Sequence, residues 1–358
     1  MSWSATPRRA TLAFLPLLAA YGCGSSAPAV GPRDSSGAAG GGADASPAGS
    51  DGAAGAAGSS TDASVDVDVT PSSVTPSPSA GCGKPASQAL AQYVTDSVHV
   101  TGATLDPTYQ APAHDRAFAV WLPHNYDPTV PWPTVFIASG CGSVATTETR
   151  YMSSAGGDPE AIYVGLASPP TDLVPSGCFD DSGTKSIEWE YFALVATQIE
   201  QRFCVDEHRE IVAGVRGGGT LANMLGCYFS KPDPSRAFAP MLALRAQFSI
   251  ASGLPVGLPG CGGAIAGFWM HDMNEFNPVT DSSSSRDRVL GLDGCASSPT
   301  EDWGTGVLAG LGCKKYIGCP AADPVVFCET TGRGRQANYY DITAPALTQF
   351  LGELGFLN

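Results

Sequence analysis

Ten residues in the middle of the chain form the one segment whose spacing is typical of a catalytic turn. The stretch IVAGVRGGGT at 211–220 reads as a buried strand, a glycine-rich turn and the start of a helix. Gly214 and Gly218 leave room for a tight turn that exposes its middle residue, and that residue is Arg216. A guanidinium stays protonated at any ordinary pH in proteins, so Arg216 cannot act as a nucleophile. The turn therefore predicts the backbone of a catalytic site that lacks its nucleophile.

The histidines limit the chemistry further. The chain has five, and none follows His271. The order of nucleophile, acid and histidine therefore cannot be completed after an acid at 272 or 275, because residues 272–358 contain no histidine. We expect His271 to shape a strand end; its use in an improvised site is the alternative. The five are His99, His114, His124, His208 and His271.

Charge and composition exclude some classes of protein. The net charge is −15, which argues against a nucleic-acid partner, because phosphates require clustered Lys and Arg. The cysteines do not form a Cys-x-x-Cys pair with a nearby histidine, so we predict neither a metal site nor a cofactor.

The first 80 residues predict export and a tether. Residues 1–23 combine two arginines, a short apolar run and Cys23, as in a bacterial signal peptide with a lipoprotein-type ending. Lipidation of Cys23 would leave a membrane-anchored lipoprotein facing the periplasm or the cell exterior, whereas plain cleavage would release a secreted one. Residues 24–80 are rich in Gly, Ala, Ser, Asp and Pro and predict a disordered tether. Residues 81–358 are then one folded domain.

The elements that must position the turn alternate between strands and helices. We expect strands at 97–101, 116–123, 134–138, 161–166, 211–215, 264–270 and 324–327, with the first two antiparallel. Helices are expected at 186–203, after the turn at 216, and at 344–354. This pattern predicts an α/β fold with a mostly parallel, doubly wound sheet.

In the order and spacing of its motifs, the domain resembles the secreted polyhydroxybutyrate depolymerase and feruloyl esterase group of the α/β-hydrolase superfamily. The turn at 214–218 then takes the place of the G-x-S-x-G nucleophile elbow. The other motifs are RAFAVWLP at 116–123, GCG at 140–142, GCF at 177–179, FCVD at 203–206, and RDR at 286–288 ahead of DGC at 293–295.

The resemblance implies a degenerate triad. Arg216 stands at the serine position, Glu275 at the acid position with Asp272 as the alternative, and Arg335 at the histidine position. The resemblance also implies that backbone N–H groups of Cys141 and Gly217 retain an oxyanion-hole-like geometry.

Ten cysteines from Cys82 to Cys328 remain once Cys23 is set aside, and export makes disulfides the expected state of all ten. Connectivity cannot be deduced from sequence, and our guesses are Cys313–Cys319, Cys295–Cys328, Cys141–Cys178, Cys227–Cys261 and Cys82–Cys204.

Three functions stay open. The first is a non-catalytic protein that binds a small carboxylate, another anion or an ester through Arg216 and Arg335. The alternative for the same residues is a purely structural cluster in which Glu275 bridges both arginines. The second is an active carboxylic-ester hydrolase with a non-standard site. The third is a structural surface lipoprotein whose loops bind another protein.

Overall fold

The computed structural model describes residues 75–102, 113–153, 160–171, 173–174, 176–180, 187–232, 242–253, 261–275, 279–298, 300–333 and 339–357. The chain divides into two compact units, residues 1–65 and 66–358, and every described residue belongs to the second. The signal peptide, Cys23 and most of the predicted tether therefore lie outside the described residues, as does Arg335.

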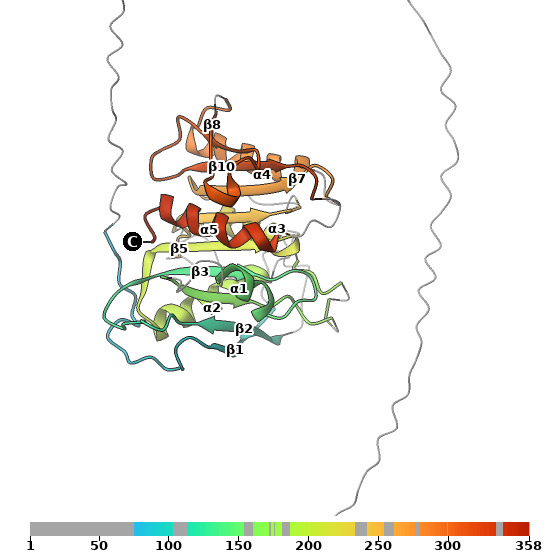
Figure 1. Ribbon diagram of the computed structural model, residues 1–358. Helices are drawn as coiled ribbons and strands as arrows, with labels where there is room; N and C mark the ends of the chain where they lie inside the picture. Colours follow the sequence, from blue (N-terminus) through green and yellow to red (C-terminus); the bar gives the residue numbers. More distant parts are fainter. Residues whose placement is uncertain are drawn as a thin grey trace, which may run out of the picture. The chain divides into compact units, whose positions relative to one another are not determined.

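A ten-stranded sheet runs through the domain in the order β1-β2-β4-β3-β5-β6-β7-β10-β9-β8 (Figure 1). The strands from β4 to β10 in that order pair in parallel, whereas β1, β2, β9 and β8 join antiparallel at the two edges. The strands are Tyr93–Val100, His114–Trp121, Trp132–Ala138, Ile162–Leu166, Val205–Val215, Ala246–Ile250, Ala266–Asp272, Thr300–Asp302, Cys313–Tyr316 and Val325–Thr330, β1 to β10.

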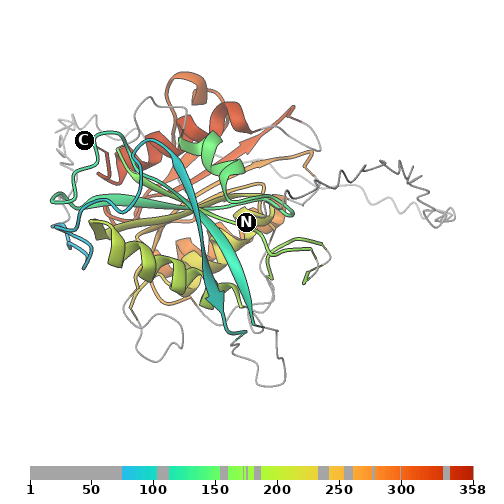
Figure 2. The same ribbon diagram turned by 90° about the horizontal axis from the view of Figure 1, so that it is seen from below.

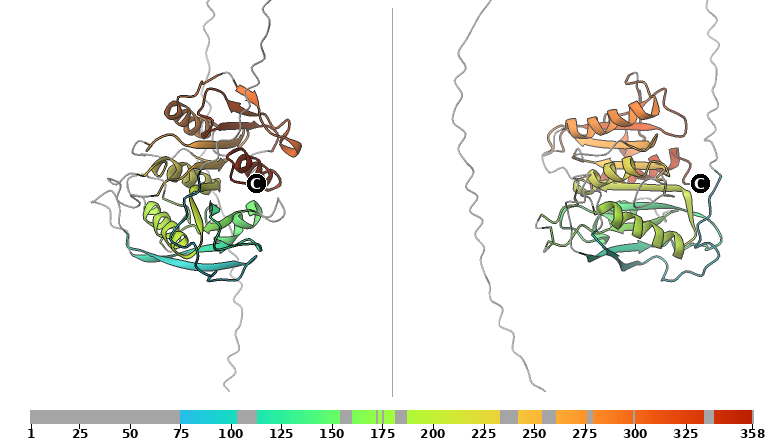
Figure 3. Two further views of the ribbon diagram at one scale, coloured as in Figure 1. Left: turned by 90° about the vertical axis from the view of Figure 1, so that its left-hand side faces the viewer. Right: turned by 180° about the vertical axis from the view of Figure 1, so that it is seen from behind.

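Helices cover both faces of the sheet. One face carries α2 (Glu188–Arg202), α3 (Gly217–Tyr228) and α4 (Val279–Asp293), and the other carries α1 (Thr146–Ser153) and α5 (Tyr340–Glu353) (Figures 1 and 3). A short 3-10 helix, Gly306–Leu308, packs on α5. Figure 2 shows the sheet from its β1 edge, where β1 and β2 cross the strands behind them because the sheet twists. This strand order and these two helical layers make an α/β-hydrolase fold.

The buried strands were predictable because the central ones read as continuous apolar runs. All seven residues of β3 and all five of β4 are buried, as expected where helices cover both faces of a parallel sheet. The antiparallel pairing of β1 with β2 is also confirmed.

The sequence analysis does not predict α1, α4, β6, β8 or β9. The α4 segment, VTDSSSSRDRVLGLD, is rich in serine, and its sequence predicts no helix. In the structure, Ser282, Ser285 and Val289 follow one another at near-helical spacing and are buried, so the small serines let the helix lie close to the sheet. The β6 segment, AQFSI, has one β-branched residue and forms a strand because β5 and β7 enclose it.

Five disulfides close the domain, which is typical of an exported protein. Cys82–Cys204, Cys141–Cys178 and Cys227–Cys261 pair as expected. The guesses Cys313–Cys319 and Cys295–Cys328 are wrong, because the bridges are Cys313–Cys328 and Cys295–Cys319. The reason is an unpredicted strand: β9 pairs with β10 so that Cys313 lies directly opposite Cys328. Cys319 then falls beside the segment after α4, where Ala296 N donates to Ile317 O.

Residues 75–80, which composition assigns to the tether, already pair with β5. Pro78 forms an antiparallel bridge with Asp206, and the side chain of Ser79 is buried. A Ser- and Pro-rich segment reads as linker by composition, yet its backbone groups still find partners on the first residues of β5.

Candidate functional site

Arg216 stands at the tip of a sharp turn between β5 and α3. Its φ of 56° and ψ of −120° lie in a region that residues with a side chain rarely adopt. The turn is held from both sides, because Arg216 N donates to Ile250 O at 2.7 Å and Arg216 O accepts from Thr220 N at 2.9 Å. Ala251, which follows Ile250, also has a positive φ of 50°. Strain of this kind typically costs about 1–3 kcal/mol for each residue and is concentrated at functional sites.

The glycines of the turn are required by close packing. A Cβ on Gly214 would lie 2.2 Å from Gly218 O, and one on Gly218 would lie 2.1 Å from Ala138 O. A Cβ on Gly219 would lie 2.9 Å from Ile250 O. The turn thus presses on the ends of β3 and β6, which confirms the geometry that the glycine spacing predicts.

The β3–α1 loop lies against the turn at the predicted place. A Cβ on Gly217 would come within 2.7 Å of Cys141 Sγ and 3.7 Å of Cys141 N, so the two residues are neighbours. The Cys141–Cys178 disulfide fixes this loop. Gly217 opens α3, and the first N–H groups of a helix have no partner within the helix. Two backbone donors therefore lie near each other, and their action as an oxyanion-type pair stays a prediction.

Glu148 of α1 is a residue of this site that the sequence reading missed. Its carboxyl group is buried, and Oε1 accepts from Gly140 N at 2.9 Å. Its Oε2 is also buried and has no hydrogen-bond partner. Glu148 lies eight residues beyond Gly140 in a segment not recognised as a helix, so no sequence signal connected the two.

The Arg216 side chain is exposed and lies near Tyr340, the first residue of α5. Burial raises the pKa of the Tyr340 phenol, the negative charge of Glu148 raises it further, and the positive charge of Arg216 lowers it. These opposing effects place both charges within electrostatic range of the same phenol. Tyr340 in turn stacks on Tyr151 of α1, with ring centroids 4.0 Å apart.

Asp272, the alternative residue at the acid position, forms hydrogen bonds inside the fold. Asp272 ends β7, is fully buried, and accepts at Oδ2 from Arg333 N at 2.9 Å and from Thr330 Oγ1 at 3.2 Å. Its Oδ1 accepts from Asn274 N at 3.0 Å. The carboxylate thereby ties β7 to the loop after β10.

Glu275 is half-buried and lies near Tyr339, the residue before Tyr340. Burial raises the pKa of the Tyr339 phenol, and the negative charge of Glu275 raises it next. Glu275 and Arg216 thus each lie within electrostatic range of a tyrosine at the start of α5. Because Arg335 lies outside the described residues, the meeting of Arg216, Glu275 and Arg335 stays a prediction.

A serine and a histidine do meet, but inside the protein. Ser282 Oγ of α4 lies 2.8 Å from Nδ1 of His271, and both side chains are buried. Ser282 also contacts Ser252 Oγ at 3.2 Å, and Ser252 accepts from Asn223 Nδ2 of α3 at 2.9 Å. A nucleophile needs an oxygen that a substrate can reach. This network therefore serves to join α3, α4 and the ends of β6 and β7.

Exposed apolar side chains lie on segments that follow strands β3, β7 and β10, at the same edge of the sheet as the turn. Val144, in the β3–α1 loop, is 65% exposed, and Met273, just after β7, is 48% exposed. Tyr151 and Tyr340 are also exposed. We call these four residues the apolar rim; they lie on loops and helix ends at the carboxyl edge of the parallel strands, where ligands bind in open α/β sheets.

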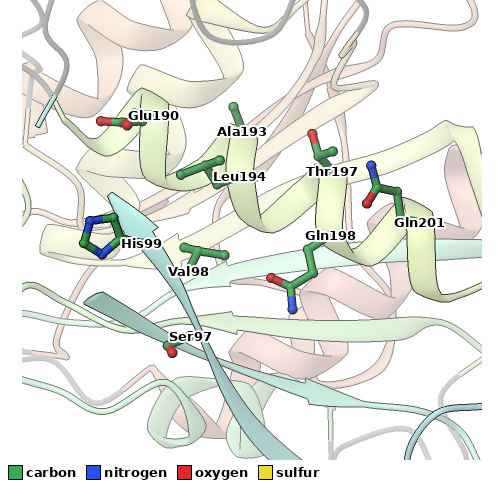
Figure 4. A pocket seen from close by; sticks show the side chains of 9 residues that line it. All are labelled: Ser97, Val98, His99, Glu190, Ala193, Leu194, Thr197, Gln198 and Gln201. Atoms are coloured by element: carbon green, nitrogen blue, oxygen red, sulfur yellow. The ribbon is translucent and has the colours of Figure 1, made fainter. Parts of the chain in front are cut away.

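Two cavities lined by described residues lie away from the turn. One, of about 570 Å³, opens between β1 and α2 (Figure 4), with His99 and Glu190 at one end and Gln198 and Gln201 at the other. The second, of about 300 Å³, includes His208, Ser230 and Arg245. Neither contains a residue of the turn.

Among the residues that the structure describes, no group of three or more His, Cys, Asp or Glu side chains is arranged to hold a metal ion. No helix in this part of the chain is long and apolar enough to cross a membrane.

No family model matches the chain, and no curated protein matches it. Among solved structures, the chain is similar to an acetyl xylan esterase from Aspergillus awamori (14% identity, TM-score 0.49, 74% of this chain and 100% of that one). It is similar to a ferulic acid esterase from Anaeromyces mucronatus (12%, 0.47, 79% and 98%). It also resembles a thermostable esterase (12%, 0.46, 73% and 62%), of which it spans less than two thirds. At these identities the likeness concerns only the path of the backbone.

Proposed function

We propose that this protein is an exported, lipid-anchored domain with an esterase-like fold that binds a small carboxylate at the elbow without cleaving it. The observation that carries the proposal is the exposed guanidinium of Arg216 on a strained turn, at the position where a hydrolase of this fold holds its nucleophile. Anchoring would occur through Cys23.

Three groups support an anionic ligand. Arg216 supplies a charged donor that matches a carboxylate with two parallel hydrogen bonds. The N–H groups of Gly217 and Cys141 lie beside it, and the amino end of the twelve-residue helix α3 favours negative charge. The apolar rim indicates that the ligand also carries a hydrocarbon part.

Glu148 works against this attraction. Its carboxylate lies in the same electrostatic neighbourhood, so it lowers the affinity for an anion. A glutamine at 148 can still accept from Gly140 N but carries no charge, so we expect Glu148→Gln to bind carboxylates more tightly than the wild type.

Isothermal titration calorimetry with acetate, butyrate and hexanoate tests the proposal. We expect affinity to rise along the series, by at most about 0.8 kcal/mol for each CH₂ group buried. Neutral hexanamide should bind at least tenfold more weakly than hexanoate.

Arg216→Ala should lose roughly tenfold to a hundredfold in affinity for hexanoate, the typical value of a hydrogen bond to a charged group. Arg150→Ala, which removes an exposed arginine of α1 that lies over Tyr93, is the matched control. No heat with hexanoate, or equal affinity in Arg216→Ala, would refute the proposal.

The second candidate is an active ester hydrolase; the Ser282–His271 contact brings a hydroxyl and an imidazole within hydrogen-bond distance, although both side chains are buried. Release of p-nitrophenol from p-nitrophenyl butyrate measures it directly. We expect wild type, Arg216→Ala and Ser282→Ala to share one background rate. Turnover by the wild type that disappears in Ser282→Ala, while the variant keeps the thermal stability of the wild type, would establish the hydrolase instead.

A further inference from the structure

The first described residues of the chain form a strap, residues 75–82, that lies along the start of β5. Besides the bridge between Pro78 and Asp206, Ser77 N donates to Asp206 Oδ1 at 2.9 Å, and Glu207 N donates to Ser77 O at 2.9 Å. The hydroxyl of Ser77 donates to Glu207 Oε2 at 3.4 Å. The strap thus contacts two carboxylates of β5 directly.

The strap also covers the end of α2. Gly81 N donates to Glu200 O at 2.8 Å, and a Cβ on Gly81 would lie 2.1 Å from Phe203 O. Contact this close shows that the strap backbone lies flat on the last turn of the helix. The Cys82–Cys204 disulfide pins one end of the strap, so only residues 75–81 are able to lift.

Three glutamates gather beside the strap with little compensating charge, and two of them contact it, Glu207 through its carboxyl group and Glu200 through its backbone oxygen. Glu210 of β5 is fully buried, and neither of its carboxyl oxygens has a hydrogen-bond partner. Burial, and then the charges of Glu200, Glu207 and Asp206, raise its pKa. Burial and then the charge of Glu207 raise the pKa of Glu200 to about 7. The nearby Arg209 is already used, since its Nε donates to Asp206 Oδ2 at 2.6 Å.

The other charged groups around the cluster have partners elsewhere. Lys84 Nζ donates to Gln201 O at 2.7 Å, and His208 Nδ1 donates to Thr75 O at 2.9 Å. Arg245 contacts the cluster with its backbone, through its N–H to Glu210 O, while its guanidinium pairs with Asp323. None of these side chains neutralises Glu200, Glu207 or Glu210.

We propose that the strap is a pH-dependent clasp, closed on β5 and α2 while the glutamate cluster holds its protons and loosened when the cluster ionises. An ionised Glu200 needs water and repels Glu207. Lifting residues 75–81 admits water to both and breaks only hydrogen bonds that water can replace.

The direction of the effect follows from proton binding. Glu200 binds its proton more tightly in the clasped state than in an open one, where it would titrate near its usual pKa of 4.5. The extra stability of the closed strap is therefore complete at and below pH 4.5, and is lost as the pH rises to about 7.

Hydrogen exchange measured by mass spectrometry on the full chain, with its disulfides intact, tests the clasp at pH 5.5 and pH 8. After correction for intrinsic exchange, we expect the amides of Ser79 and Gly81 to be at least about tenfold more protected at pH 5.5. In Glu200→Gln, which cannot ionise, protection should stay high at both values. Glu207→Gln removes the repelling charge and should reduce the difference to less than half, which provides a second test should Glu200→Gln fail to fold.

Glu301→Gln, which removes an exposed carboxylate from the edge strand β8, is the control and should behave as the wild type. Equal protection of the strap at both pH values would overturn the proposal. So would a pH effect in Glu200→Gln as large as in the wild type. A loss of protection at pH 8 that is equal in β3 and β4 would also overturn it, because that would show global destabilisation and no local release.

Discussion

At the scale of single residues, Arg216 combines an unfavourable backbone with an exposed charge. A backbone with φ of 56° and ψ of −120° is energetically unfavourable for arginine, whereas glycine adopts it readily. Its neighbours impose the conformation through the hydrogen bonds to Ile250 and Thr220. Strain that is kept at an exposed position indicates a role in binding, because packing does not require the side chain.

This predicts that Arg216→Gly stabilises the fold while it abolishes the anion site. Relief of the strained φ should raise the free energy of unfolding by about 1 kcal/mol. The same change at Arg150, inside α1, should lower it by a similar amount, because glycine weakens a helix by about 1 kcal/mol. Urea denaturation measures both variants. A destabilised Arg216→Gly would mean that the side chain holds the turn together, contrary to our reading.

At the scale of elements, the elbow is the point where the carboxyl ends of strands β3, β5 and β6 meet. The turn between β5 and α3 touches the carboxyl ends of β3 and β6 through glycines, and the β3–α1 loop covers it. The spacing of the glycines made this local geometry predictable from the sequence.

The element-scale prediction compares two glycine-to-alanine changes. Gly218→Ala places a methyl group 2.1 Å from Ala138 O, so backbone must move, and we expect a loss of roughly 2 kcal/mol or more. Gly291→Ala, in α4, meets open space and should gain about 0.5–1 kcal/mol. Thermal and urea denaturation measure the change in the free energy of unfolding of both variants. If the two changes shift stability in the same direction, the packing of the elbow is looser than described.

At the scale of the whole molecule, the sequence predicted the sheet better than the site. Continuous apolar runs identified the central strands, because burial on both faces leaves a strong signal. The electrostatic surroundings of Arg216 could not be predicted, since Glu148 and Tyr340 come from α1 and α5, which the sequence places far apart. The link from Asp272 to Arg333 likewise spans 61 positions and depends on which strands are neighbours.

Strand β5 sets the distance between the two ends of the domain described above. Its pairing with β3 runs from Val205 opposite Trp132 to Gly214 opposite Ala138, so the strap and Arg216 lie at opposite ends of β3, roughly 20 Å apart. The strap and the elbow thus lie at opposite edges of the sheet, so a small ligand held at Arg216 leaves residues 75–81 uncovered.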